Sequence, residues 1–359
     1  MSRAATAIIH LDAICQNYRL AKQIGQGRGT LAVVKANAYG HGAAQVAHKL
    51  HNEADAYAVA CIEEALELRQ SGITKPILLL EGFFTPDEIP LISEHQFWCA
   101  LHCQEQLDML ARTPLPTPLS VWLKLDTGMH RLGFRSDQIL NRYPEITRLS
   151  QVKDVTLMTH LACADELSSP MTGKQITELR RLEQQLKLPS SIANSAGVLA
   201  HPDSLSDWQR PGIMLYGASP FAMAETLPYT LHTTMTLQSE IIAIHDLQPG
   251  DSVGYGATWV CDRPMRVGTV AMGYADGYPR HAGNGTPVWV AGQQSQLVGR
   301  VSMDMLTVDI TGRDDVGLGA PVELWGKHVN AGTVAEHAGT IPYTLFTGVT
   351  ARVKKRYQD

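Results

Sequence analysis

The sequence has no long apolar run, and its positive charges do not outnumber its negative ones. The longest aliphatic run, Ile77–Leu80, is far shorter than the roughly 20 apolar residues that cross a bilayer as a helix. The segment from Met1 to Leu11 lacks a basic start followed by an apolar stretch, so we expect no signal peptide. Lys and Arg number 30 against 35 Asp and Glu, a net charge of -5 with neutral histidines. We therefore expect neither a nucleic-acid partner nor a membrane partner.

The cysteines and histidines show no disulfide or metal pattern. The six cysteines are scattered without a Cys-x-x-Cys pair, and the 14 histidines lack the spacing typical of zinc ligands, so we expect no metal. Scattered reduced thiols are typical of the cytoplasm. Hydrophobic residues make up 44% of the chain and charged residues 18%, the balance of a folded globular protein. We therefore expect a globular cytoplasmic protein.

Short apolar runs alternate with helical patterns over the first two-thirds of the chain. The helical patterns include Ala43–Leu50 and Ile62–Gln70. Alternating strands and helices are typical of βαβ units with a parallel sheet, and eight such units predict a (β/α)8 barrel. The predicted strands are Leu31–Lys35, Tyr57–Ala60, Ile77–Leu80, Phe97–Leu101, Val121–Leu125, Thr156–His160, Ser191–Ala193 and Gln209–Ile213.

The pattern changes near residue 234, where closely spaced β-like runs with few helices begin. Turn signals such as Pro249-Gly250 separate these runs. We expect a barrel over residues 10–233 and a mainly antiparallel β domain over 234–359, completed by residues 1–9. The predicted strands of the β domain are Met235–Ile244, Arg266–Met272, Pro287–Val290, Gln296–Val301, Leu306–Ile310 and Val322–Trp325.

Reactive side chains fall at the predicted carboxyl ends of the barrel strands, where such barrels carry their active sites. Lys35 ends an apolar run, and burial there favours the neutral, nucleophilic amine that forms a Schiff base. A surface lysine or a buried structural histidine would explain any one of these residues alone. Their coincidence at strand ends favours an active site. The residues are Lys35, Lys124 with Asp126, His160, Asn194 with Ser195, and Arg210.

Residues 33–42 (Val-Val-Lys-Ala-Asn-Ala-Tyr-Gly-His-Gly) resemble the pyridoxal-phosphate lysine motif of bacterial alanine racemases. Further motifs follow in the family's order and extend over essentially the whole chain. The resemblance implies an eight-stranded barrel followed by a β domain, in agreement with the pattern of strands. The further motifs are 124–133 (Lys-Leu-Asp-Thr-Gly-Met-His-Arg-Leu-Gly), 210–217 (Arg-Pro-Gly-Ile-Met-Leu-Tyr-Gly), 253–256 (Val-Gly-Tyr-Gly), 273–280 (Gly-Tyr-Ala-Asp-Gly-Tyr-Pro-Arg) and 299–305 (Gly-Arg-Val-Ser-Met-Asp-Met).

The resemblance implies a racemase that interconverts L-alanine and D-alanine and supplies D-alanine for peptidoglycan. Lys35 would bind pyridoxal phosphate as an imine and act as the base toward D-alanine. Tyr255 of the other subunit would be the base on the opposite face, and His160 and Arg210 would form a hydrogen-bonded chain that favours its phenolate. Arg210 would also lie against the pyridine nitrogen, where a guanidinium that keeps its proton favours reprotonation of the α-carbon over transamination.

The resemblance also implies the remaining contacts of the site. Arg131 would bind the cofactor's phenolic oxygen and the substrate carboxylate, and Met303 of the other subunit would contact the substrate. Lys124 matches a lysine that is often carbamylated in the family, a change whose negative charge would hold Arg131. The phosphate contacts would be Tyr39, Ser195, Gly212, Ile213 and Tyr343, and the corridor to the site would be lined by Asp165, Tyr274, Arg280 and Arg300. Tyr343 is followed by Thr344 where the family often has glutamate, a departure that concerns the rim of the site.

A homodimer with shared active sites follows from this resemblance, because Tyr255 and Met303 must reach the neighbouring barrel. Two alternatives use the same cofactor. A related enzyme could decarboxylate basic amino acids or racemise a broader range, but a decarboxylase does not need the Tyr255 motif. A non-catalytic pyridoxal-phosphate carrier would be a lone barrel, which the added β domain opposes. Residues 193–197 loosely match the nucleophile elbow of hydrolases, but no Asp and His follow in a recognisable triad context.

Overall fold

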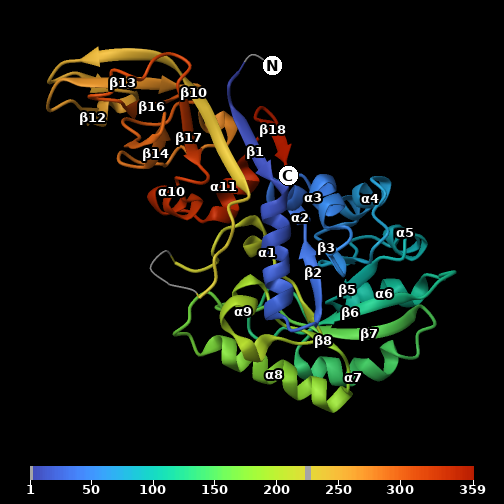
Figure 1. The fold of residues 1–359 in the computed structure, drawn as a ribbon. Helices are drawn as coiled ribbons and strands as arrows, with labels where there is room; N and C mark the ends of the chain where they lie inside the picture. The colour runs from blue at the N-terminus through green and yellow to red at the C-terminus, as the bar shows by residue number, and fades with distance from the viewer. Residues whose placement is uncertain (1–2, 223–227) are drawn as a thin grey trace.

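The computed structural model describes residues 3–222 and 228–359, which form a barrel and a β domain (Figure 1). Eight parallel strands close the barrel in sequence order, so the predicted (β/α)8 fold is confirmed. Strands β2 to β4 are almost wholly buried, as expected for parallel strands covered by helices. The barrel strands are β2 (Gly29–Val33), β3 (Ala56–Val59), β4 (Ile77–Leu79), β5 (Trp98–Leu101), β6 (Leu119–Lys124), β7 (Val152–Met158), β8 (Ser190–Ser191) and β9 (Trp208–Gln209).

Each barrel strand overlaps the run that predicted it, but several end earlier than expected. The run Gln209–Ile213 is a strand only at β9, because the chain turns at Arg210 into the loop before the short 3-10 helix Ile213–Tyr216. Lys35 and His160 likewise lie just beyond β2 and β7 rather than inside them. Lys35, His160 and Arg210 therefore sit just beyond the strand ends, whereas Lys124 is the last residue of β6.

The interior of the barrel is filled rather than open. The indole rings of Trp98 in β5 and Trp208 in β9 lie 5.2 Å apart although their strands stand on opposite sides of the barrel. The ring of Trp122 in β6 completes the cluster, 5.6 Å from that of Trp98. These aromatic side chains make a packed core, so a ligand reaches the barrel only at its mouth.

Helices surround the barrel and bury one side each. In α8, the buried positions Gln175, Leu179 and Leu182 recur at a spacing of three or four residues, which is the spacing of one helix face. The predicted helices Ala43–Leu50 and Ile62–Gln70 are confirmed as α3 and α4. The others are α1 (Leu11–Ile24), α5 (Glu88–Glu94), α6 (Gln104–Arg112), α7 (Ser136–Ile146), α8 (Met171–Leu186) and α9 (Ser195–Ala200). The segment labelled α2 (Lys35–Tyr39) is left-handed from Ala36 to Tyr39 and is not an α-helix.

The β domain is a mixed but mainly antiparallel sheet with a small separate hairpin. Its central strand β10 pairs with β1, β13 and β17, and β1 and β18 form its one parallel pair among the described strands. The strands are β1 (Thr6–His10), β10 (Met235–Leu247), β13 (Met265–Val270), β14 (Pro287–Val290), β15 (Gln293–Gln296), β16 (Leu306–Asp309), β17 (Pro321–Trp325) and β18 (Lys354–Gln358), the hairpin is β11 (Ser252–Val253) with β12 (Trp259–Val260), and the helices are α10 (Ala331–His337) and α11 (Pro342–Gly348).

The prediction of a strand at Gln296–Val301 was wrong. Strand β15 begins at Gln293 and ends at Gln296, because the turn at Ala291 and Gly292 starts the hairpin with β14 immediately. Leu297 and Val298 are buried, which explains the apolar signal, but Leu297 forms only a single bridge to Val308.

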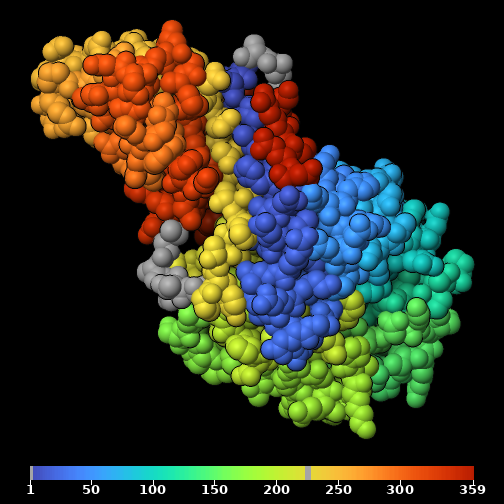
Figure 2. All heavy atoms as spheres, viewed as in Figure 1, coloured from blue at the N-terminus to red at the C-terminus, as the bar shows by residue number. Residues whose placement is uncertain are grey.

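The chain passes between barrel and β domain through neighbouring strands. Thr6 of β1 pairs with Gln238 of β10 and with Lys354 of β18, so β1 lies between them. Figures 1 and 2 show these three segments side by side above the barrel. Below them, the buried ring of His41 contacts the hydroxyl of Thr234 at 2.9 Å and the carbonyl oxygen of Tyr39 at 3.0 Å. The junction is thus part of the packed structure rather than a loose linker.

Candidate active site at the mouth of the barrel

A cavity of about 610 Å³ opens at the carboxyl ends of the barrel strands. This volume is in the range of small-molecule sites. The structure brings most of the predicted site residues together in its wall: Lys35, Tyr39, Lys124, Arg131, His160, Ser195, Arg210, Gly212, Ile213 and Tyr343. Tyr343 comes from α11, so the β domain of the same chain closes one side of the cavity.

The segment after Lys35 is a left-handed turn. Residues 36–39 have φ values between 51° and 54°, a conformation that costs L-residues roughly 1–2 kcal/mol each. Side chains from elsewhere hold it, because Glu64 accepts hydrogen bonds from the amides of Ala36 (2.6 Å) and Ala60 (2.8 Å). Asn37 accepts one from the amide of Ala43 at 2.8 Å. Such strain persists only where the surroundings enforce it, and here it presents Lys35 and Tyr39 to the cavity.

Four cationic side chains share the cavity wall, namely Lys35, Lys124, Arg131 and Arg210. Of the described lining residues, Glu81 alone carries a carboxylate. Burial lowers the pKa of Lys35, and the charge of Arg131 lowers it further. Burial, reinforced by Arg210 and Arg131, lowers the pKa of Lys124 to about 8. The site therefore favours anionic ligands and holds amines that lose their protons easily.

His160 follows β7 and Arg210 follows β9, on either side of β8, and both lie inside this positive field. Burial and then the charge of Arg210 lower the pKa of His160 well below its ordinary value, so its imidazole is neutral at pH 7. Burial lowers the pKa of Arg210 to about 10, and the guanidinium stays protonated. It donates to the hydroxyl of Ser191 and to the carbonyl oxygens of Thr159 and Ile192. The expected hydrogen-bonded chain from Arg210 through His160 to Tyr255 stays a prediction.

Ser195, Gly212 and Tyr39 form a compact group on the β8 and β9 side of the cavity. The Ser195 hydroxyl accepts hydrogen bonds from the amides of Gly212 (2.8 Å) and Met214 (3.3 Å). A Cβ atom at Gly212 would overlap the hydroxyl of Tyr39, so only glycine allows this approach. The rings of Tyr39 and Tyr343 lie 5.9 Å apart, and burial followed by the charge of Asp165 raises the pKa of Tyr343 to about 12.

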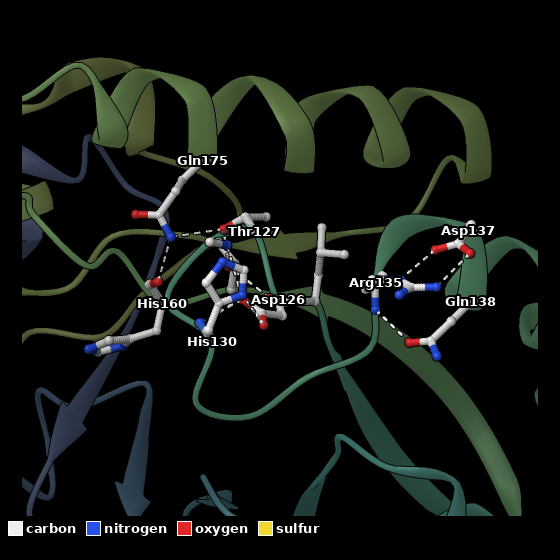
Figure 3. Close-up of polar contacts among 11 residues, drawn as sticks. Asp126, Thr127, His130, Arg135, Asp137, Gln138, His160 and Gln175 are labelled. Atoms are coloured by element: carbon white, nitrogen blue, oxygen red, sulfur yellow. Dashed lines mark hydrogen bonds and ion pairs between the residues drawn. The ribbon is translucent and has the colours of Figure 1, made fainter.

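Arg131 sits on a closed loop after β6. The amide of Asp126 donates to the carbonyl oxygen of Phe134, and the amide of Phe134 donates to that of Lys124, each at 2.9 Å. Asp126 also accepts hydrogen bonds from the amides of Gly128 and His130 at 3.0 Å (Figure 3). These bonds fix both ends of the loop, so Arg131 projects from a shaped segment.

Other predicted residues lie outside the cavity. Tyr255 is 66% exposed and Met303 53% exposed, both on loops of the β domain. Arg300 lies beside the Tyr255 turn, since a Cβ atom at Gly256 would be 3.3 Å from its guanidinium. The amide of Ala275 donates to the carbonyl oxygen of Met303 at 2.9 Å, which joins the loops of Tyr274 and Met303. The loops that carry the exposed residues Tyr255, Tyr274, Arg300 and Met303 are called the rim loops below. The corridor candidates Arg280 and Asp165 are also exposed.

Several residues of the site were not predicted from the sequence. Glu81 lines the cavity two residues after β4, where the strand-end rule would have found it. Glu64 and Gln175 lie on helices and act through backbone groups, so their sequence positions carried no motif. In residues 3–222 and 228–359, no group of three potential metal ligands gathers, and no helix is both long and apolar enough to cross a membrane.

Comparison with known proteins identifies the family. The model of the alanine racemase N-terminal domain matches residues 9–220, and that of the C-terminal domain matches residues 234–357. The catabolic alanine racemase of Pseudomonas putida is 53% identical over 99% of both chains. The crystal structure of the biosynthetic alanine racemase from Pseudomonas aeruginosa superposes with a TM-score of 0.95 at 45% identity, covering 99% of this chain and 100% of that one. The alanine racemase from Bartonella henselae, solved with covalently bound pyridoxal phosphate, gives a TM-score of 0.90 at 30% identity over 99% of both chains. The chain therefore belongs to the alanine racemase family of isomerases.

Proposed function

We propose that this enzyme racemises alanine by proton transfer on two faces of the α-carbon, with Lys35 on one face and Tyr255 of a partner subunit on the other. One observation carries the proposal. The cavity gathers Lys35 with Arg131, His160 and Arg210, whereas Tyr255 of the same chain is 66% exposed on the β domain. A single chain thus holds half of a two-base site and presents the other half outward.

The cavity fits pyridoxal phosphate. Its cationic wall suits a phosphate and a substrate carboxylate together, and the bound cofactor of the Bartonella enzyme supports the assignment. Lys35, whose pKa burial lowers, would hold the cofactor. The contact of Gly212 with Tyr39 leaves a cradle that a Cβ atom would fill. The residues that would hold the phosphate are Tyr39, Ser195, Gly212, Ile213 and Tyr343.

When bound, pyridoxal phosphate withdraws electrons from the substrate and acidifies its α-proton. Lys35 exchanges this proton on the face of D-alanine, because its lowered pKa supplies neutral amine. Tyr255 of the partner subunit exchanges it on the face of L-alanine. Arg131 binds the substrate carboxylate through its planar guanidinium, and Met303 of the partner subunit contacts the substrate.

Arg210 and Lys124 set the charge around the reaction. Arg210 keeps its proton at neutral pH, so beside the pyridine nitrogen of a bound cofactor it would transfer no proton and would favour return of the proton to the α-carbon. Lys124 has a pKa of about 8 and therefore a reactive neutral fraction near pH 7. Its amine would add to carbon dioxide and lose a proton, and the resulting carbamate would hold Arg131.

The rim loops support a homodimer with shared sites. They place exposed apolar side chains, among them Tyr255 and Met303, on one β domain, where a second barrel would cover them. Asp165, Tyr274, Arg280 and Arg300 would then line the corridor to the site. We also propose the division into 10–233 and 234–359 with residues 1–9, which the pairing of β1 with β10 and β18 supports.

A complementation experiment tests the shared site. Lys35→Ala and Tyr255→Phe chains, each inactive alone, are dissociated, mixed and reassembled. A mixed dimer then contains one intact site, so about a quarter of wild-type activity should return. Tyr229→Phe, outside the proposed site, is the matched control and should behave like wild type. Absence of recovered activity in verified mixed dimers would refute the shared site.

Proton exchange distinguishes the enzyme from its alternatives. L-Alanine in heavy water should lose its α-proton and reach equal amounts of both enantiomers with the wild-type enzyme. In the Tyr255→Phe variant, exchange from L-alanine should fall steeply while Lys35-dependent exchange from D-alanine persists. Release of carbon dioxide would indicate a decarboxylase, and no exchange despite bound cofactor would indicate a carrier.

We propose that the product D-alanine serves peptidoglycan synthesis, in a cytoplasm whose reducing conditions suit the six free cysteines. The name of the Pseudomonas putida relative favours a second candidate, the catabolic use of alanine. A deletion strain separates the two. A requirement for D-alanine would support the first role, and loss of growth on D-alanine as the carbon source without such a requirement would support the second.

A further inference from the structure

Gln175 is a fully buried polar residue on α8 that contacts two active-site loops. We propose that Gln175 is a positioning residue, which fixes the loop carrying Arg131 against the loop carrying His160. The inference rests on the proposed role of Arg131 in binding the substrate carboxylate. It concerns a residue that lies behind the cavity wall rather than in it.

The side-chain amide of Gln175 bridges the two loops directly (Figure 3). Its Nε2 donates to the carbonyl oxygen of His160 and to the hydroxyl of Thr127, each at 3.0 Å. Its Oε1 accepts a hydrogen bond from the amide of Ala162 at 2.8 Å. Both hydrogens of the amide and its oxygen are therefore used, and a buried amide satisfied in this way has one orientation.

The hydrogen bonds continue beyond Thr127 in one direction. The Thr159 hydroxyl donates to the carbonyl oxygen of Leu125 at 2.9 Å, so it accepts from the Thr127 hydroxyl at 2.7 Å. The Thr127 hydroxyl must therefore accept its hydrogen bond from Gln175. Of the two polar groups in the Gln175 amide, only the N–H group can donate one. The carbonyl oxygen of Thr159 in turn accepts a hydrogen bond from Arg210. The Gln175 amide therefore sets the direction of a series of hydrogen bonds that connects the loops after β6 and β7.

The backbone of the Arg131 loop is too constrained to replace the hydrogen bonds of Gln175 with others if they are lost. It contains left-handed backbone at Gly128, His130 and Gly133, with φ values of 133°, 54° and 129°. A Cβ atom at Gly128 would overlap the methyl group of Met171 on α8, so the loop already lies against the helix. Arg131 follows within the same loop, and a displacement of the loop would move its guanidinium away from the substrate carboxylate.

Gln175→Met tests the proposal, because methionine keeps the length of the side chain but neither donates nor accepts comparable hydrogen bonds. Gln185→Met, an exposed position on the same helix, is the matched control. We expect Gln175→Met to raise KM for alanine roughly tenfold and to lower kcat no more than about threefold. Competitive inhibition by acetate, a carboxylate without the amino group, should weaken by the same factor as KM rises.

Thr127 provides a second test that leaves α8 untouched. Thr127→Val keeps the shape and removes the hydroxyl, and it should raise KM and weaken acetate inhibition as Gln175→Met does. Thr127→Ser restores the hydroxyl and should restore both values. In the double variant, the effects of Gln175→Met and Thr127→Val should be less than additive, because both break one chain.

The proposal fails if Gln175→Met matches Gln185→Met in KM and acetate inhibition, or if Thr127→Val matches Thr127→Ser. If Gln175→Met does not fold, the Thr127 pair decides alone. Arg131→Lys tests the underlying function separately. An unchanged KM there overturns the carboxylate role of Arg131, whereas a raised KM there with an unchanged KM in Gln175→Met overturns only the role of Gln175.

Discussion

Substitution of Gly40 by alanine probes the contact between the barrel and the β domain. Gly40 has a φ of 79°, and a Cβ atom there would overlap the carbonyl oxygen of Phe346 in α11. An alanine must therefore keep a left-handed backbone and push α11 away from the left-handed turn at residues 36–39. Because α11 also carries Tyr343, the displacement reaches the wall of the active site.

The expected loss can be worked out from these contacts. The left-handed backbone costs alanine roughly 1–2 kcal/mol, and overpacking against a backbone oxygen adds about 1–3 kcal/mol. Alanine recovers about 0.5–1 kcal/mol because its unfolded chain has less entropy than that of glycine. Gly40→Ala should therefore lower the free energy of unfolding by about 1–4.5 kcal/mol and weaken cofactor binding.

Gly27 offers a matched control for this measurement. Its φ is 81°, and within the described part of the chain nothing lies within 4 Å of a Cβ placed there. Urea unfolding followed by circular dichroism should show that Gly27→Ala loses only the backbone contribution, about 1 kcal/mol. Equal losses in the two variants would show that α11 does not press against Gly40, and the reasoning would be refuted.

Three further predictions follow from charge and packing at the junction and the site. In carbon-dioxide-free buffer, the free energy of unfolding should rise between about pH 8 and 10.5, because in this range Lys124 binds a proton in the unfolded chain but not in the folded one. In urea titrations, Lys124→Met should flatten this rise. Burial lowers the pKa of His41 to about 4, so stability should fall as the pH drops from 6.5 toward 4, where only the unfolded chain binds this proton. His41→Gln should remove about one proton from that slope, and an unchanged slope would contradict the assignment. Gly212→Ala should displace the Tyr39 hydroxyl and raise the Kd for pyridoxal phosphate in absorbance titrations, whereas Gly217→Ala, outside the cavity wall, should act only on stability.

The alternation of strands and helices was sufficient to predict the barrel, because buried parallel strands such as β2, β3 and β4 produce apolar runs. The strand-end rule then located Lys35, His160 and Arg210, since the side chains that follow such strands face one cavity. The strand-end rule did not show at which residue each strand ends. The left-handed turn at residues 36–39 is stabilised by Glu64 on another helix, and this contact forms only when the chain has folded.

Gln175 shows most clearly why contacts between a helix side chain and a distant loop could not be predicted from the sequence. Its position matches the apolar spacing of Leu179 and Leu182, so a polar residue there was a signal in principle. The spacing cannot tell whether such a residue is satisfied by a neighbouring loop or faces water at the edge of the stripe. The failed strand at Gln296–Val301 has the same origin, because burial of Leu297 produced an apolar run without a strand partner along it.

The place of β1 in the sheet has a consequence for biosynthesis. Its two pairing partners, β10 and β18, are separated from it along the chain by the entire barrel. Strand β1 therefore leaves the ribosome long before either partner exists, and the barrel can fold while both edges of β1 remain open to other chains. The two domains pair through this sheet only after the later strands have been synthesised. A chain truncated at residue 353 lacks β18, so it should contain a folded barrel, an unpaired edge at β1 and a tendency to aggregate.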